Sequence, residues 1–318
     1  MLYYVIQLFK YIFSCSIKQK KGFVCFKFKI QSALMGKVQW YGFVIFENFM
    51  ETIKTPRILS ENHILSSAYL NRDVKLDIYL PGNILSAGEV SLLLINDGQN
   101  LCEMNFKSIA EENMDSIEPL LYAGIHCSKD RKNEYGTAGI LDYKGRGTKA
   151  KAYQQFIFNE LIPFIRKTYG IYSFKEKSFC GFSLGALSAL DIVWNHPREF
   201  SKVGLFSASL WWRTVSQDDD LFDENIHRIM HNKIRSGNYY PWLKFFFETG
   251  TKDETADRNN NGIIDAIDDT LSLIDELVLK GYSREKDIKY LELTDGRHDI
   301  ATWAKAFPEF LKWGWGRG

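Results

Sequence analysis

Residues 177–194, KSFCGFSLGALSALDIVW, hold the pattern that decides the fold of this chain. The stretch 178–180 is short and apolar enough for a buried strand. From Leu184 to Val193 apolar residues recur at the spacing of one helix face. Between the two lies 181–185, GFSLG, a G-x-S-x-G sequence. A strand, a sharp turn and a helix around this sequence are typical of a nucleophile elbow.

The elbow predicts a role for Ser183 and for three of its neighbours. Gly181 and Gly185 leave room where a strained turn presses the backbone against the next strand and helix. The Ser183 hydroxyl would then lie exposed above the sheet as a nucleophile, with the Leu184 N–H directed at a developing oxyanion. The alternative is a serine that caps a helix beside small packing residues.

Strand-like and helix-like segments alternate along the rest of the chain. We expect strands at 63–70, 74–80, 90–95, 120–125, 178–180, 202–206, 243–247 and 288–293. We expect helices at 152–169 (kinked at Pro163 and ended by Gly170), after Ser183, at 269–280 and at 300–313. This order predicts an α/β fold with a mostly parallel central sheet, an antiparallel start and helices on both faces.

The first 49 residues differ in composition from the rest. Glu47 is their only acidic residue, and the apolar stretch 2–17 is interrupted by Lys10 and too short to span a bilayer. We expect Met50 to be the natural start, residues 1–49 to be an extension outside the folded domain, and residues 50–318 to form one domain. A poor signal anchor is the alternative for this segment.

The bulk composition excludes some functions. A net charge of +1 gives no support for nucleic-acid binding, and we expect no membrane contact for residues 50–318. The five cysteines are scattered, odd in number and without C-x-x-C spacing. We therefore expect buried thiols in a reducing compartment and a cytoplasmic protein. Export or membrane tethering through the N-terminal segment is the alternative.

A serine nucleophile needs a base, and His298 is the candidate among six histidines. It lies in 295–299, DGRHD, between the last predicted strand and the last helix, where a loop at the carboxyl end of a strand would present it. Of the others, two precede Ser183, His196 ends the helix after the elbow, and His227 and His231 lie on an expected surface helix. The alternative is a loop histidine that caps the final helix.

The acid that orients the base should follow the strand at 243–247. Four carboxylates are candidates: Glu248, Asp253, Glu254 and Asp257. The sequence 249–251, TGT, forms the turn off the strand, and Asp253 comes just after it. We favour Asp253, with Glu254 and Asp257 as the alternatives. A solvated loop carboxylate is the non-functional possibility for each.

The second oxyanion donor should come from the loop 96–100, NDGQN, after the third strand. Gly98 allows the turn, and the Gln99 N–H is the expected donor. We expect the Asp97 side chain to hold the loop by hydrogen bonds to backbone.

A separate pattern at 257–268, DRNNNGIIDAID, matches the calcium loop of EF-hands. The predicted ligands of a structural calcium ion are Asp257, Asn259, Asn261, the Ile263 carbonyl, Asp265 and Asp268. Asp268 stands where a glutamate is usual. The alternative is an Asx-rich loop closed by its own side-chain hydrogen bonds.

These motifs together resemble the putative-esterase family of α/β-hydrolases. The family includes enterochelin esterases, feruloyl esterases, S-formylglutathione hydrolases and mycolyl-transferase antigens. The stretches that carry the resemblance are LLLINDGQN, DRKNEYGTAG, NELIPFIRKTYG, the elbow and DGRHDIATWAKAFPEFLKW. The similarity covers about Met50 to the C-terminus, and the match is weakest at the acid.

The resemblance implies a Ser–His–Asp hydrolase of the α/β-hydrolase fold that cleaves small-molecule esters or thioesters without a catalytic cofactor. It also implies that Arg131, Tyr135, Trp211 and Trp212 lie on loops near Ser183 and form an acyl or aromatic pocket. Packing under those loops is their alternative role. Acyl transfer on the same scaffold, and a non-catalytic binding protein, are the other functions considered. The residues do not distinguish catecholate siderophore esters, feruloyl sugars and glutathione thioesters as substrates.

Overall fold

The structure of the protein, a computed structural model, describes residues 14–20, 23–32, 35–42, 58–82 and 89–317, with side chains from residue 58 onward. The chain divides into two compact units, residues 1–56 and residues 57–318. The described part of the first unit is an antiparallel sheet in the order β1–β2–β3, formed by β1 (Ser14–Lys20), β2 (Phe23–Ser32) and β3 (Met35–Gly42). The predicted start at Met50 lies outside the described residues.

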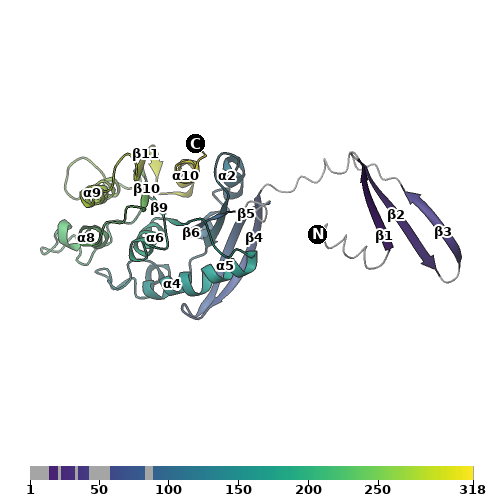
Figure 1. Cartoon of the computed structure of the whole chain (residues 1–318). Coiled ribbons are helices and arrows are strands. Elements are labelled where there is room, and N and C mark those ends of the chain that lie inside the picture. Colours follow the sequence, from purple (N-terminus) through teal and green to yellow (C-terminus); the bar gives the residue numbers. More distant parts are fainter. Residues whose placement is uncertain (1–13, 21–22, 33–34, 43–57, 83–88, 318) are drawn as a thin grey trace. The chain divides into compact units, whose positions relative to one another are not determined.

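The second unit is built on an eight-stranded sheet in the spatial order β11–β10–β9–β8–β6–β7–β5–β4 (Figure 1). Its strands are β4 (Ile58–Ser67), β5 (Arg72–Pro81), β6 (Ser91–Asn96), β7 (Leu120–Ile125), β8 (Lys177–Phe182), β9 (Lys202–Phe206), β10 (Lys244–Lys252) and β11 (Ile288–Arg297). From β7 across to β11 all neighbours pair in parallel, whereas β5 pairs antiparallel with β4 and β7. The predicted mostly parallel sheet with an antiparallel start is confirmed.

Helices cover both faces of this sheet, which is why its central strands are apolar on both sides (Figure 1). The larger core lies under α4 (Ala150–Phe156), α5 (Ile162–Tyr169), α6 (Leu184–Asn195), α8 (Ile229–Ser236) and α9 (Asp265–Lys280). The smaller core, rich in aromatic rings, lies under α2 (Phe106–Asn113) and α10 (Ile300–Trp315). The short helices η2 (Gly98–Asn100), α3 (Arg131–Glu134) and α7 (Glu224–His227) lie in connecting segments. The predicted α/β-hydrolase arrangement of layers is therefore present.

The helix predicted at 152–169 is interrupted. A π-helical segment, η3 (Ile157–Leu161), separates α4 from α5, and Pro163 stands in the first turn of α5. Proline has no N–H to donate to the preceding turn, so the backbone there adopts wider hydrogen bonding. Gly170, with φ 65°, ends α5 as predicted.

Two sequence-based expectations were wrong. The helix expected around His227 and His231 is broken at Arg228. His231 is only 1% exposed, and its Nε2 lies 2.9 Å from the carbonyl oxygen of Asp269. The thiols are not all buried: Cys180 is, but Cys102 is exposed in the turn after η2.

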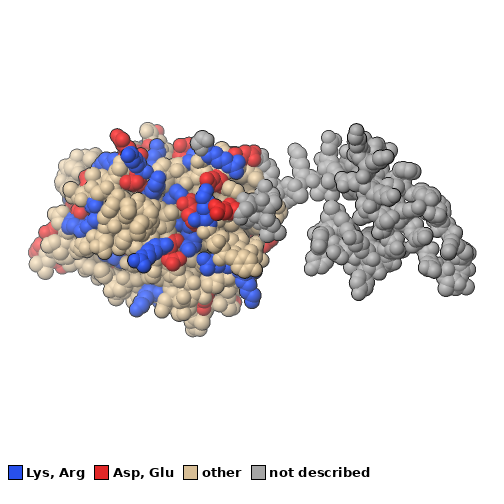
Figure 2. All heavy atoms as spheres, in the orientation of Figure 1, with Lys and Arg blue, Asp and Glu red and all other residues tan. Residues whose placement is uncertain are grey.

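The surface carries no charge segregation on the face drawn in Figure 2, where Lys and Arg side chains alternate with Asp and Glu. No helix among the described residues has the length and apolarity needed to cross a membrane.

Candidate active site

Ser183 occupies a sharp turn between β8 and α6. Its φ of 56° and ψ of −123° are sterically costly for a residue with a side chain. Two backbone hydrogen bonds hold the turn, from the Ser183 N–H to the carbonyl of Phe206 at 2.9 Å and from the Ser209 N–H to the carbonyl of Ser183 at 3.2 Å. The Ser183 Oγ lies 3.3 Å from the Ser209 Oγ.

The two glycines of the motif allow this turn to fit. A Cβ on Gly181 would lie 2.6 Å from the carbonyl carbon of Gly185, and a Cβ on Gly185 would overlap the carboxylate of Asp97. A side chain at either position would therefore push α6 away from β8 or from the loop after β6. This agrees with the steric role that the sequence predicts for both glycines.

The two expected oxyanion donors have free N–H groups. Neither the Gln99 N–H in η2 nor the Leu184 N–H at the start of α6 makes a hydrogen bond within the described part of the chain. An unpaired N–H at a helix start is available to an anion. Both groups lie just beyond the carboxyl ends of adjacent parallel strands, β6 and β8.

The loop that carries Gln99 is held by Arg131. The guanidinium binds both carboxylate oxygens of Asp97 at 2.7 Å and also donates to the carbonyl oxygen of Phe182 at 3.2 Å. The Asp97 carboxylate thus accepts hydrogen bonds from Arg131 and from the side-chain amide of Gln99 (3.1 Å). The predicted hydrogen bonds from this side chain to backbone are not found among the described residues. A guanidinium satisfies a buried carboxylate better than single N–H groups do, because it supplies charge and two parallel bonds.

His298 lies between β11 and α10, at the carboxyl edge of the sheet. Its ring packs edge-on against Trp303, with centroids 5.5 Å apart, and Trp303 stacks on Phe182 at 5.0 Å. The cap of α10 is Asp299, whose carboxylate accepts the Thr302 N–H at 2.8 Å, so His298 does not cap this helix. Burial lowers the pKa of His298 below its usual 6.5, assisted by the charge of Arg131 and opposed by that of Asp253.

Asp253 directly follows β10, and His298 directly follows the neighbouring strand β11. A Cβ on Gly296 of β11 would lie 2.9 Å from the Cα of Gly250 on β10, so the ends of the two strands approach closely. Burial raises the pKa of Asp253, while Ser207, the Gly250 backbone and His298 lower it. Neither carboxylate oxygen of Asp253 makes a hydrogen bond of regular geometry within the described residues.

The other candidate acids have different surroundings. The pKa of Glu254 is raised by burial and by the charge of Asp265. The Asp257 carboxylate accepts the N–H groups of Asn261 (3.1 Å) and Gly262 (2.9 Å). Of the four predicted carboxylates, only Asp253 acts on the pKa of His298.

Two of the four predicted pocket residues are fully buried. Tyr135 and Trp212 are both 0% exposed, and the Tyr135 hydroxyl accepts the Asp97 N–H at 3.1 Å. They pack under the loops, which is the alternative role considered for them. Arg131 keeps 29% of its side chain exposed and Trp211 is half-buried, with the guanidinium of Arg146 5.4 Å from its ring.

The predicted calcium loop is closed by its own side chains. The amide nitrogens of Asn259 and Asn261 lie 3.1 and 3.4 Å from the two carboxylate oxygens of Asp268. The guanidinium of Arg258 is 3.3 Å from the Asp265 carboxylate, and the Ile263 N–H donates to the Asn261 side chain at 2.8 Å. Within the described residues no group of three or more His, Cys, Asp or Glu side chains is arranged to hold a metal. The predicted ligand set also contains amides and a carbonyl, so calcium binding stays a prediction.

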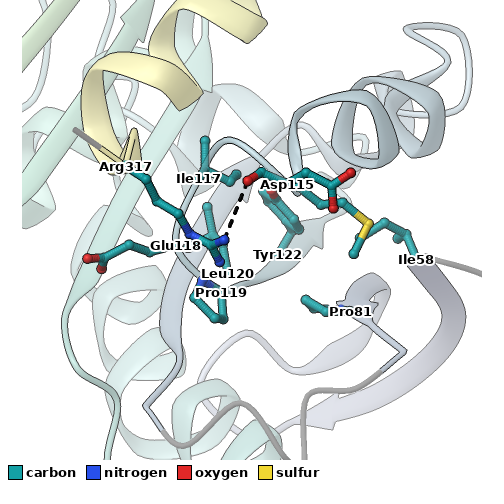
Figure 3. Close-up of a pocket in the computed structure, with 10 residues that line it drawn as sticks. Ile58, Pro81, Asp115, Ile117, Glu118, Pro119, Leu120, Tyr122 and Arg317 are labelled. Atoms are coloured by element: carbon teal, nitrogen blue, oxygen red, sulfur yellow. Dashed lines mark hydrogen bonds between the residues drawn. The ribbon is translucent and has the colours of Figure 1, made fainter.

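Two hollows in the described part of the chain lie away from Ser183. The first, of about 170 Å³, lies beside Leu120 at the amino end of β7, where Arg317 donates to the Asp115 carbonyl at 3.4 Å (Figure 3). The second, of about 460 Å³, lies over α4, η3 and α5 near His196. Neither is lined by a predicted site residue.

Sequence reasoning missed Ser209, whose hydroxyl lies beside that of Ser183, Trp303, which packs against His298, and Ser207, which lowers the pKa of Asp253. The indole N–H of Trp303 donates to the Ser207 Oγ at 2.9 Å. The available signal was that Ser207 and Ser209 follow the predicted strand 202–206, whose carboxyl end lies at the same edge as the elbow.

Comparison with known proteins places these features in a family. Residues 67–313 match the family model described as Putative esterase. The chain belongs to this esterase family. It is accordingly a carboxylic ester hydrolase, as the sequence predicted. It is also 25% identical over 253 residues to the uncharacterized protein YjcH of Bacillus subtilis (strain 168), covering 77% of this chain and 93% of that protein.

Solved structures share the fold at low identity. The enterobactin esterase FES from Shigella flexneri superimposes with a TM-score of 0.60 at 19% identity, and the match covers 80% of the present chain and 59% of FES. The present chain therefore spans little more than half the length of FES. A ferulic acid esterase superimposes with a TM-score of 0.55 at 16% identity, covering 80% and 96%. The siderophore hydrolase EstB from Aspergillus nidulans gives 0.58 at 16% identity, covering 81% and 95%.

Proposed function

We propose that this esterase cleaves small-molecule carboxylic esters or thioesters through a Ser183–His298–Asp253 triad and an acyl-enzyme. The observation that carries the proposal is the strained turn at Ser183, which lies at the same sheet edge as the His298 loop. Strained backbone is retained where the surrounding structure enforces it, which is common at catalytic nucleophiles.

In the proposed reaction the Ser183 hydroxyl attacks the ester carbonyl while the imidazole of His298 takes its proton. The tetrahedral oxyanion collapses, the alcohol or thiol leaves with the proton that His298 returns, and Ser183 holds the acyl group. Water then attacks the acyl-enzyme by the same steps. The lowered pKa of His298 supports this role, because it keeps the imidazole neutral and ready to accept a proton at neutral pH.

Asp253 would orient the imidazole and stabilise the imidazolium. Support comes from its charge, which alone among the four candidate carboxylates raises the pKa of His298. The free N–H groups of Gln99 and Leu184 would bind the oxyanion, each contributing on the order of 10²-fold or more to kcat.

For the substrate we propose an ester with an aromatic acyl group, such as a siderophore or feruloyl-type ester. Trp211 offers a half-buried ring, and the guanidinium groups of Arg146 and Arg213 lie 5.4 and 5.8 Å from it. Such a surface favours stacking of an aromatic acid. Acyl transfer to an alcohol uses the same residues and is the second activity that the test must separate.

The test combines labelling and turnover. Ser183→Ala should abolish labelling by a fluorophosphonate and turnover of p-nitrophenyl acetate, whereas Ser188→Ala, on the buried body of α6, should label and turn over like the wild type. Labelling that persists in Ser183→Ala would overturn the nucleophile. A panel of catecholate siderophore esters, feruloyl esters and glutathione thioesters then identifies the substrate class. The same assays with an added alcohol acceptor distinguish acyl transfer from hydrolysis.

A further inference from the structure

The side chain of Glu248 is a buried carboxyl that the proposed mechanism does not use. Glu248 lies on β10 and is 1% exposed. Neither of its carboxyl oxygens has a hydrogen-bond partner of regular geometry within the described residues. Buried polar atoms without partners are rare in folded proteins, and such a group calls for a physical account.

Ser207 lies between Glu248 and the proposed triad acid. It is 3% exposed and holds a φ of 44°, a strained value for serine, directly after β9. Its N–H donates to the backbone carbonyl of Glu248 at 2.9 Å. Hydrogen bonding from its hydroxyl lowers the pKa of the Glu248 carboxyl and also that of the Asp253 carboxyl.

A count of donors and acceptors at Ser207 suggests how the three groups are related. A hydroxyl has one proton to donate and two lone pairs that can accept. The indole N–H of Trp303 occupies one lone pair at 2.9 Å. If Glu248 is protonated, its O–H can fill the second lone pair, and the single Ser207 proton is left for Asp253. If Glu248 is ionised, it competes with Asp253 for that proton.

We propose that Glu248 is a positioning residue: as a neutral acid it donates to the Ser207 Oγ, so that Ser207 donates to Asp253 and orients it toward His298. The proposal rests on Asp253 being the triad acid. It also assigns a regulatory consequence, because ionisation of Glu248 would withdraw the Ser207 hydroxyl from Asp253 and lower activity at alkaline pH. The strained φ of Ser207 fits this role, because strained backbone is kept where the surrounding structure fixes a functional side chain.

The surroundings of Glu248 support the neutral form. Burial, followed by the negative charge of Asp253, raises the pKa of Glu248 to about 8. The other charged group that faces it is Asp299, before α10, which acts in the same direction. Tyr290 on β11 is a titratable group whose own pKa Glu248 helps to raise, and the neutral Ser207 follows β9.

The experiment uses the full chain and five variants: Glu248→Gln, Glu248→Ala, Ser207→Gly, Ser207→Ala and the double variant Glu248→Gln/Ser207→Gly. Glycine suits position 207 because it removes the hydroxyl and tolerates the positive φ, so this variant should fold. Ser207→Ala serves as a second hydroxyl deletion. For each, kcat/KM for p-nitrophenyl acetate and the rate of fluorophosphonate labelling are measured from pH 6 to 9.5, with circular dichroism at each pH.

In the wild type, activity should fall above about pH 8 while the circular dichroism spectrum is unchanged. Glu248→Gln, whose amide also donates to Ser207, should stay within about threefold of the wild type at pH 7 and lack the alkaline fall. Glu248→Ala and Ser207→Gly should each lose about tenfold at pH 7, the size expected for one hydrogen bond to a charged group. Adding Glu248→Gln to Ser207→Gly should change nothing further.

The proposal is overturned if Glu248→Gln keeps the alkaline fall, or if Ser207→Gly retains wild-type activity. Failure of the proposed function gives a different result. In that case Ser183→Ala or Asp253→Asn would remain active, whatever the behaviour of the Glu248 variants.

Discussion

The guanidinium of Arg131 binds both carboxylate oxygens of Asp97 at 2.7 Å, and the same group donates to the carbonyl of Phe182. One side chain thereby joins the loop of the expected oxyanion donor to the strand that ends at Ser183. Asp97 is 1% exposed, and removal of this partner would leave a buried carboxylate unpaired. Arg131 therefore sets the spacing between two parts of the site that are distant in the sequence.

Replacement of Arg131 by alanine should reduce both stability and activity. The loss of stability should be about 2 kcal/mol, less than for a fully buried pair because Arg131 keeps 29% of its side chain exposed. Arg131 lowers the pKa of His298, so its removal should also move the acid limb of kcat/KM to higher pH. Thermal unfolding and a pH profile measure the two effects. Arg131→Ala/Asp97→Asn should recover stability but not kcat, and an unmoved acid limb would contradict the proposed proximity.

Replacement of Asp253 by asparagine should lower kcat by something like 10⁴-fold, because the imidazole would be held in the wrong tautomer. Asp253 raises the pKa of His298, so in Asp253→Asn that pKa should fall further below 6.5. Labelling rates across pH, with histidine proton resonances, test both points. The matched controls are Glu254→Gln and Asp257→Asn. An inactive control beside an active Asp253→Asn would move the acid role to that residue.

Glu248 should make the protein less stable as the pH rises. Its pKa is 4.5 when exposed and about 8 in the folded state, so the folded form keeps a proton that the unfolded chain releases. The stability present below pH 4.5 is lost progressively as the pH rises toward 8. At about 1.4 kcal/mol per pKa unit this loss approaches about 5 kcal/mol, so Glu248→Gln should unfold roughly 10–20 °C higher than the wild type at pH 8.

The pH dependence provides the check. The difference in melting temperature between Glu248→Gln and the wild type should shrink toward zero near pH 4.5. A constant difference at every pH would mean that Glu248 does not titrate as inferred.

The loop 257–268 should respond to calcium as a structural ion, with no part in the chemistry. Millimolar calcium should raise the melting temperature, because an ion that binds only the folded state stabilises it. Arg258 lies 3.3 Å from Asp265 and 3.8 Å from Asp268, and this positive charge should keep the affinity low. Asp268→Asn should abolish the response, and Asp265→Ala should weaken it less than Asp257→Ala does.

Calorimetric titration of the chelator-stripped protein is the decisive measurement for this loop. Magnesium is the control ion, since it fits such a loop poorly. No heat and no thermal shift with calcium would leave a loop closed only by its own hydrogen bonds.

The residues before Met50 should be dispensable for activity. The compact unit that holds Ser183 and His298 begins at Arg57. A chain that begins at Met50 should therefore turn over p-nitrophenyl acetate at the rate of the full chain. Insolubility, or loss of the folded circular dichroism spectrum, would show that the first segment is needed.

The sequence alone was sufficient for the elements whose signals are local. The sharp turn between β8 and α6 was predictable because Gly181, Ser183 and Gly185 act on one another within five residues, where steric rules apply directly. Gly170 marked the end of α5 for the same reason. The order of strands and helices followed from apolar runs and their spacing, and with it the parallel sheet. What failed locally was burial: neither the exposed Cys102 nor the buried His231 carried a periodic signal.

Only the tertiary structure decided which side chains meet at the site. Trp303 and Ser207 are 96 residues apart in sequence, and Arg131 and Asp97 are 34 apart, yet both pairs are hydrogen-bonded. Parallel strands bring their carboxyl ends to one edge, so the loops after β6, β8, β9, β10 and β11 converge whatever their separation along the chain. The burial that sets the ionisation of Glu248, Asp253 and His298 arises from this convergence, because the pKa of a group depends on its solvent and neighbours and not on its position in the sequence.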